Sequence, residues 1–246
     1  MAKKIILAIA VCFCILTAPH PSVSQDSGLP PLKIHPLPYF LANWQDAEHL
    51  GDYFDRVNTT PLGHLVWSRF PLKIYLEKPE TAGNTAEEKR FQAWRETVKE
   101  AIAQWNDYLP LIEIDESETA DIIILRSQPA REIKPNPETG LFDIPRAIAA
   151  ETTYEFYLTK DNPSILAHKM TVQISSAFVG KSLLATARHE LGHALGIWGH
   201  SPEITDTLYY SQVRNPLPIS KRDINTLKKI YQQPTRLGWE IKRSQI

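Results

Sequence analysis

Residues 189–200 have the sequence HELGHALGIWGH, and this stretch decides the interpretation of the whole chain. His189 and His193 are four residues apart, so on a helix their imidazoles project from one face, a spacing that suits two ligands of one zinc ion. Glu190 lies beside them, and from the next position it reaches a water activated by the metal rather than the metal itself. The pattern therefore predicts a catalytic zinc site with Glu190 as general base.

The segment that carries this motif is predicted to be a helix that starts near Lys181 and ends at Gly196. Glycine ends helices in the left-handed conformation, so the chain can turn sharply there. His200 then returns from the following segment as the third protein ligand and leaves the fourth position open, as catalytic zinc sites require. One catalytic Zn²⁺ ion is expected. Histidines in an ordinary core or surface role are the alternative interpretation.

Other segments show the periodicity of strands and helices. Residues 71–77 alternate apolar and polar side chains, as a half-buried strand does. Residues 85–109 carry apolar side chains at spacings of three and four, which predicts a long amphipathic helix. Further strands are expected at 112–114, 121–125, 147–158 and 170–174, with 160–167 as a connection, a short helix at 44–54 and a final helix starting at Ser220.

Residues 1–24 have the features of an export signal. Lys3 and Lys4 precede an apolar run at 5–16, which is followed by small and turn-forming residues. An uncleaved anchor helix is the alternative, but this run is short of the ~20 apolar residues that cross a bilayer. We therefore predict a secreted or extracytoplasmic protein with no stable membrane span once the signal is removed.

Both cysteines of the chain, Cys12 and Cys14, lie inside that apolar run. Removal of the signal would leave a chain without cysteine, which excludes disulfides, a thiol nucleophile and cysteine-ligated zinc. The formal net charge of -1 is too small to steer a particular partner. No basic patch with interleaved aromatic residues indicates nucleic-acid binding, so nucleic acid is not an expected partner.

A chain of 246 residues with 43% hydrophobic and 22% charged content suits one globular domain with short extensions. After the signal peptide, we expect an N-terminal extension or pro-segment at 25–62, a catalytic domain at 63–234 and a C-terminal tail at 235–246. The protein is expected to be a monomer whose partner is an extended peptide or protein substrate.

The motif resembles the HExxHxxGxxH signature of metzincin zinc peptidases. Its residues are most similar to those of the matrixins, the matrix metalloproteinase group. One residue is extra, because three residues rather than two separate Gly196 from His200. A bulge at Gly199 is expected to absorb it. Leu208 stands where matrixins have the methionine of the Met-turn, and it can supply a similar apolar floor under the ligands.

The resemblance covers roughly residues 65–232. ADIIILR at 120–126 is similar to a matrixin strand, and ISKRDINTLKKIY at 219–231 is similar to the final matrixin helix. Asp223 matches the aspartate that supports the Met-turn, whereas Arg222 replaces its acidic neighbour, so the usual salt bridge to a freed N-terminus is not expected. The resemblance implies an α+β, metzincin-like catalytic domain: a twisted, mostly parallel sheet of about five strands packed on two long helices, with a C-terminal helix.

The activity that this resemblance implies is that of a secreted zinc-dependent endopeptidase. The substrate would lie extended against the edge strand at 147–158, since added-strand pairing holds a peptide without demanding a particular sequence. Tyr210 lies where astacin-like and serralysin-like metzincins carry a tyrosine that approaches the zinc and the oxyanion, so it is a second catalytic candidate. Residues 211–218 are expected to shape the main specificity pocket.

Two alternatives are open at this point. The extra residue could misplace His200, and Asp206 would then be the third ligand of a different zinc hydrolase, because zinc accepts carboxylates. The missing methionine could instead indicate a secreted, non-catalytic protein that binds zinc with a metzincin fold. The intact Glu190 argues for the enzyme.

Overall fold

The computed structural model describes residues 28–79, 83–130, 134–135, 142–143, 149–211 and 216–241. The predicted signal peptide lies outside these residues. Five strands form one sheet in the order β2-β1-β3-β7-β6. The strands are β1 (Leu72–Leu76), β2 (Leu111–Ile114), β3 (Ile122–Leu125), β6 (Ala150–Leu158) and β7 (Leu166–Ile174). The first three and β7 run parallel, whereas β6 pairs antiparallel with β7 and forms one edge of the sheet.

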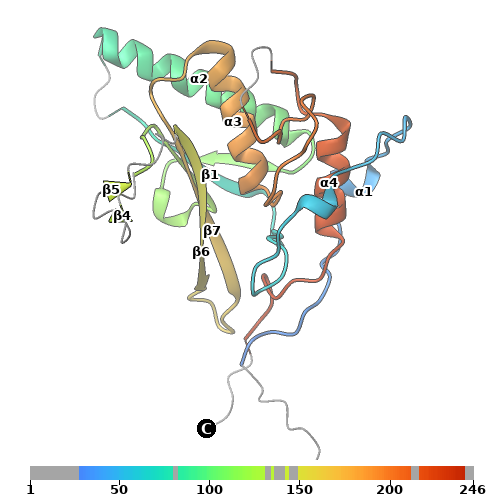
Figure 1. The fold of residues 1–246 in the computed structure, drawn as a ribbon. Coiled ribbons are helices and arrows are strands. Elements are labelled where there is room, and N and C mark those ends of the chain that lie inside the picture. The colour runs from blue at the N-terminus through green and yellow to red at the C-terminus, as the bar shows by residue number, and fades with distance from the viewer. Residues whose placement is uncertain are drawn as a thin grey trace, which may run out of the picture.

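Helices pack on this sheet and beside it (Figure 1). α2 and α3 pack against each other and α3 also contacts β6 and β7, whereas α1 lies against α4 at the side of the molecule. Within the described part of the chain, no helix is long and apolar enough to cross a membrane. The helices are α1 (Tyr39–Asn43), α2 (Ala86–Asn106), α3 (Gly180–Ala194) and α4 (Lys221–Tyr231), with 3₁₀ turns at Phe54–Arg56 and Ser117–Thr119 and a small antiparallel pair of β4 (Lys134–Pro135) and β5 (Phe142–Asp143).

The sheet follows from alternation of side chains along its strands. β7 buries every second residue, and β1 shows the same pattern over its five residues. Side chains on alternate positions point to one face, so each of these strands gives a continuous apolar row to the core. The buried residues of these rows are Leu72, Ile74, Leu76, Leu166, Met170, Val172 and Ile174, with His168 in the same row.

α2 fixes the position of the helix that carries the histidine motif. It starts at a capping box in which Thr85 and Glu88 satisfy each other's backbone N–H groups. Its apolar stripe is buried, and Trp105 at the far end is fully enclosed. The indole Nε1 of Trp105 donates to the carbonyl oxygen of Arg188 at 2.9 Å, which joins α2 directly to α3 beside the motif.

The α+β fold with a mostly parallel five-stranded sheet and a C-terminal helix is the one expected from the sequence. The helices predicted at 85–109 and from Ser220 are present as α2 and α4. β7 starts at Leu166, inside the segment expected to be a connection. The first residues of the strand predicted at 147–158 lie outside the described part of the chain, and the remainder forms β6.

The helix predicted at 44–54 was wrong. The helical residues of this region are α1, which ends at Asn43, and a 3₁₀ turn that begins at Phe54. His49 and Gly51 have φ angles of 54° and 78°. These left-handed conformations are incompatible with a right-handed helix through both residues. The segment is held instead by contacts with α4, where Asn225 donates to the carbonyl oxygen of Gly51 at 2.7 Å.

Segments on both sides of the predicted catalytic domain reach its core. Leu41 and Tyr53 from the N-terminal extension are buried, as is Leu237 from the predicted C-terminal tail. Lys33 and Thr235 form a reciprocal pair of backbone hydrogen bonds of 3.1 and 2.9 Å. The described parts of both extensions are therefore packed on the domain, while the proposed boundaries at 62 and 234 stay a prediction.

One buried histidine makes the fold sensitive to acid. His168 on β7 stacks on Trp67 with ring centroids 3.8 Å apart, and its Nε2 has no hydrogen-bond partner among the described residues. Burial lowers the pKa of His168 to about 3. Below pH 6.5 the unfolded chain therefore takes up a proton here that the folded chain does not, and stability falls as the pH falls.

We expect His168→Phe, which keeps an aromatic ring at this position, to remove part of that pH dependence. Between pH 6.5 and 5 the wild type should lose about 2 kcal/mol more unfolding free energy than the variant. Urea unfolding at both pH values measures this. His49→Asn, which removes an exposed imidazole, is the control and should behave as the wild type. Equal pH dependence in all three proteins would contradict this account.

Candidate metal centre

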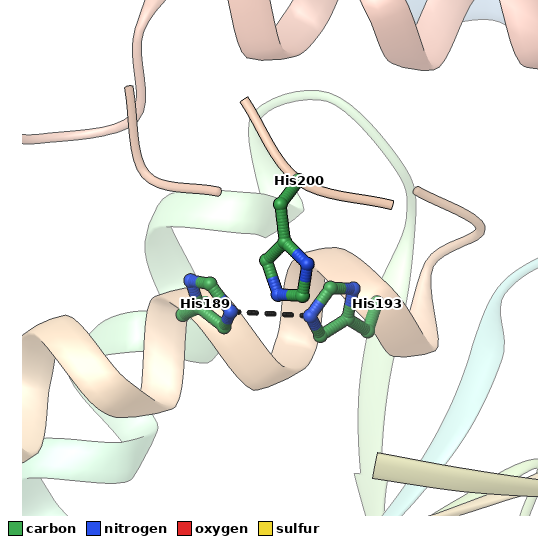
Figure 2. A group of neighbouring side chains, drawn as sticks. All are labelled: His189, His193 and His200. Atoms are coloured by element: carbon green, nitrogen blue, oxygen red, sulfur yellow. Dashed lines mark hydrogen bonds between the residues drawn. The ribbon is translucent and has the colours of Figure 1, made fainter. Parts of the chain in front are cut away.

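α3 carries two of the three predicted ligands. His189 and His193 lie one turn apart on the same face, with their Nε2 atoms 3.1 Å from each other. His200 comes back from the segment after the helix, and its ring points toward the other two (Figure 2). The ring centroid of His200 lies 5.2 Å from that of His189 and 4.9 Å from that of His193. One nitrogen of each imidazole lies within 4.8 Å of the other two, so all three can face one ion.

A sharp turn after α3 brings His200 back. Gly196 has a φ angle of 124°, and a Cβ at this position would collide with the carbonyl oxygen of Leu65, so glycine is required there. The extra residue is taken up by two successive tight turns. In these, the N–H of Trp198 donates to the carbonyl of Gly196 at 2.9 Å, and the N–H of Gly199 donates to the carbonyl of Ile197 at 3.0 Å.

The N-terminal extension holds this turn from outside. Val57 forms an isolated antiparallel bridge with Gly199, and the N–H of Asn58 donates to the carbonyl of Trp198 at 2.8 Å. A Cβ on Gly199 would collide with the carbonyl oxygen of Arg56, so only glycine permits so close an approach. At Gly199, where the sequence predicts a bulge, the backbone therefore pairs with the N-terminal extension, and this pairing fixes its position.

The imidazoles have the geometry and protonation that zinc requires. Nδ1 of His189 is 2.9 Å from the carbonyl oxygen of Thr207, and Nδ1 of His193 is 2.7 Å from that of Ile197. A carbonyl oxygen only accepts, so Nδ1 carries the proton in both rings and the Nε2 lone pairs are left for a metal. Ligand atoms at the usual Zn–N distance of ~2.0–2.1 Å in a tetrahedron lie roughly 3.3 Å apart, close to the observed Nε2 separation.

Burial keeps these rings neutral. The pKa of His193 falls to about 3 and that of His189 to about 4, in both cases mainly because burial disfavours the imidazolium, with the neighbouring histidines adding to it. Neutral imidazole is the form that binds a metal. The donor set and its surroundings therefore fit a zinc ion.

Glu190 lies beside the ligands and is buried. Its Oε2 accepts a 2.7 Å hydrogen bond from the hydroxyl of Thr152 on β6, and the same hydroxyl lies 3.0 Å from the Glu190 carbonyl oxygen. Burial raises the pKa of Glu190 to about 7, although the Thr152 hydrogen bond opposes this. The carboxyl group is thus oriented by the edge strand and faces a cleft of about 410 Å³ that all three histidines line.

Leu208 packs against α3, the helix that carries His189 and His193. It is fully buried, and a Cβ on Gly192 of α3 would come within 2.6 Å of its side chain. The backbone of its turn is tied to Asp223, whose carboxylate accepts from the N–H of Thr207 at 2.9 Å and from the N–H of Leu208 at 3.4 Å. Because the carbonyl of Thr207 accepts from His189, Asp223 acts on a ligand through this turn.

The extension reaches the same carboxylate. The hydroxyl of Tyr53 donates to Oδ1 of Asp223 at 2.5 Å, and both groups are buried. The N–H of Tyr53 donates to the hydroxyl of Thr226 at 3.0 Å, so the residue is fixed at its backbone as well. Burial raises the pKa of Asp223, while the Tyr53 hydrogen bond lowers it. A hydrogen-bonded path thus runs from the extension to His189.

Asp206 is not placed among the ligands. Its carboxylate accepts from the hydroxyls of Ser201 at 2.5 Å and Ser220 at 2.7 Å, and it forms an ion pair with Arg222 at 3.0 Å. These partners occupy the group that would have to bind zinc in the alternative geometry. The histidine cluster therefore disfavours Asp206 as the third ligand.

Tyr210 is 66% exposed and packs against Tyr209, with ring centroids 4.4 Å apart and ring planes inclined by 46°. It lines a cavity next to His189 and Glu190, but no hydrogen bond joins it to the histidines among the described residues. Its catalytic role stays a prediction. Of the predicted specificity segment at 211–218, residues 212–215 lie outside the described part of the chain.

Comparison with known proteins decides the family. A model of the matrixin family, a family of peptidases, matches residues 81–232. The chain belongs to the matrixin family. No curated protein matches the chain closely enough to be counted a relative. Matrixins are zinc-dependent metalloendopeptidases, so this matrixin is a metallopeptidase, and its three-histidine cluster is of the kind that holds the family's zinc.

Two site residues had no signal in the sequence. Thr152 lies in an ordinary strand segment, and Tyr53 precedes the matched region by almost thirty residues. Each acts through a contact between residues distant in the chain, which periodicity and motif spacing do not encode. The histidines and Glu190, in contrast, have a fixed spacing on one helix and could be found from the sequence.

We expect Tyr53→Phe to weaken both the fold and the metal site, because the buried Asp223 carboxylate would lose a donor. The loss should be about 1–3 kcal/mol in unfolding free energy. Zinc affinity should fall roughly tenfold, as for other changes behind a metal ligand. Competition with a fluorescent chelator measures the affinity. Tyr39→Phe, which changes an exposed ring, is the control. If the Tyr53 variant has the same unfolding free energy and zinc affinity as this control, Tyr53 does not support the metal site.

Proposed function

We propose that this matrixin is a secreted endopeptidase in which His189, His193 and His200 hold one zinc ion and Glu190 is the general base. The observation that carries the proposal is the convergence of three neutral imidazoles next to a buried carboxyl group in one open cleft. That combination has the parts a hydrolytic zinc site needs: three protein ligands, an open position and a proton acceptor.

Zinc held by the three histidines would supply Lewis acidity, which would activate water and polarise a carbonyl group. Glu190 accepts the proton from water and later delivers it to the leaving amine. A dication held by the imidazoles lowers the pKa of a neighbouring carboxyl group, which favours the ionised base. Thr152 keeps one oxygen of Glu190 fixed by its hydrogen bond and leaves the other for this proton transfer.

The substrate is proposed to lie along β6. This strand forms one edge of the sheet, and Ala150 to Thr152 at its start line the cleft together with the histidines. A peptide that adds to this edge as another strand is held by its backbone, so its ends need not be near the site. This favours cleavage within a chain. A second catalytic contribution from Tyr210 belongs to the same proposal.

The remaining parts of the proposal rest on the sequence. Lys3 and Lys4 with the apolar run after them support export, and the small net charge supports neither a nucleic-acid nor a charged-surface partner. We propose a monomer that acts on extended peptides outside the cytoplasm. A non-catalytic zinc-binding protein is disfavoured, because Glu190 is oriented by a hydrogen bond in the way a working base would be.

We expect Glu190→Gln to retain zinc but to lose casein hydrolysis by roughly 10² to 10⁴, because the amide keeps the shape of the side chain but accepts no proton. Bound zinc is measured by atomic emission and cleavage by release of fluorescent peptides. Glu116→Gln, an exposed position that does not line the cleft, should cut as the wild type does. If the wild type binds zinc but does not cleave casein, the protein is non-catalytic. If the Glu190 variant is fully active, Glu190 is not the general base.

A further inference from the structure

A second cavity of about 240 Å³ opens beside the metal cluster. It shares His189, Glu190 and Ala150 with the metal cleft, so a side chain of a peptide bound at the site can enter it directly. Its walls are formed by α3, the start of β6 and the segment after the third ligand. The charge of these walls determines which kind of substrate side chain the cavity accepts.

Arg188, the residue before the first ligand, lines this cavity. It is only 8% exposed. Its Nε donates to the side-chain oxygen of Gln104 at 2.5 Å, and one terminal nitrogen donates to the carbonyl of Leu217 at 3.1 Å. Both acceptors are neutral, and a guanidinium has five N–H donors, so these contacts orient the group without compensating its charge.

Two other guanidinium groups, the buried one of Arg95 and the half-buried one of Arg222, show what is absent here. Arg95 is paired with Glu113 at 2.9 Å, and Arg222 with Asp206 at 3.0 Å. Among the described residues, no carboxylate lies within ion-pair distance of Arg188. Buried charges in proteins are normally paired, because an unpaired one costs desolvation energy without return.

The acidic groups nearby are already engaged. Glu100 is exposed and acts on Arg188 from beyond Gln104, whose amide donates to Glu100 at 3.2 Å. Burial lowers the pKa of Arg188 and outweighs the charge of Glu100, which raises it. Asp206 in the cavity wall is held by Arg222. Glu190 is bonded to Thr152. The cavity beside the metal cluster therefore has a buried guanidinium in its wall that forms no ion pair with a carboxylate of the described residues.

We propose that this cavity receives the carboxylate of an Asp or Glu side chain next to the scissile bond, and that Arg188 determines this specificity. The inference rests on the proposed peptidase function and adds a class of substrate to it. A guanidinium matches a carboxylate with two parallel N–H donors, a pairing that glutamine or leucine cannot replace. Arg188 acts on substrate selection, since it lies in the wall of the cavity and not among the metal ligands.

The test begins with the full mature chain and casein, whose cut sites are mapped by mass spectrometry. An acidic residue should be enriched at one fixed position directly before or after the cut. Two synthetic peptides then carry Glu or Gln at that position, and both have amidated C-termini so that only the side-chain carboxylate can bind. The wild type should cleave the Glu peptide with a kcat/KM roughly tenfold higher or more, as expected for a charge-assisted pair.

Arg188→Gln should bring that ratio close to one. Lys181→Gln, an exposed position on the same helix with the same loss of charge, should keep the wild-type ratio. A wild-type ratio of one or less overturns the inference, even if the variant does not fold. A preference that persists in Arg188→Gln overturns it as well. Absence of any casein cleavage by the wild type contradicts the peptidase proposal itself, which is a distinguishable result.

Discussion

The carboxylate of Asp223 is the buried group on which the arrangement of the metal cluster depends. It accepts from Tyr53 of the extension, from the N–H groups of the turn at 207–208 and from the N–H of Ser220 at the start of α4. A single charge in the core thus joins the distant extension to the turn at 207–208 and to the start of α4. Such a charge is tolerated only when it is fully hydrogen-bonded, so each segment is needed to keep the others in place.

These hydrogen bonds position the metal site through the turn at 207–208. The turn held by Asp223 presents the carbonyl of Thr207 to His189 and places Leu208 under α3. Leucine for methionine nearly conserves volume, and here the branched side chain lies against Gly192, where a larger helix residue would not fit. The extension adds a second restraint at Gly199 on the side of the third ligand. The two departures from the family pattern are therefore accommodated by local packing.

How much of this could be predicted depends on the range of the interaction. Ligand spacing on α3, the alternation of β1 and the capping box at Ser220 are local patterns, and the structure has them where the sequence indicates them. β7 also alternates, but it starts at Leu166, earlier than predicted. The region at 44–54 has helical composition but is set by contacts with α4 about 170 residues away, such as that of Gly51 with Asn225. Thr152 and Tyr53 became visible as site residues only when the sheet and the extension were in place.

The most direct test of the account is the position of the metal itself. Crystals of the mature chain with one equivalent of zinc can be measured on both sides of the zinc absorption edge. A single anomalous peak is expected, bonded to the Nε2 atoms of His189 and His193 and to a ring nitrogen of His200, at the usual distance of ~2.0–2.1 Å. A peak coordinated by Asp206 in place of His200, or no peak at the histidine cluster, would contradict it.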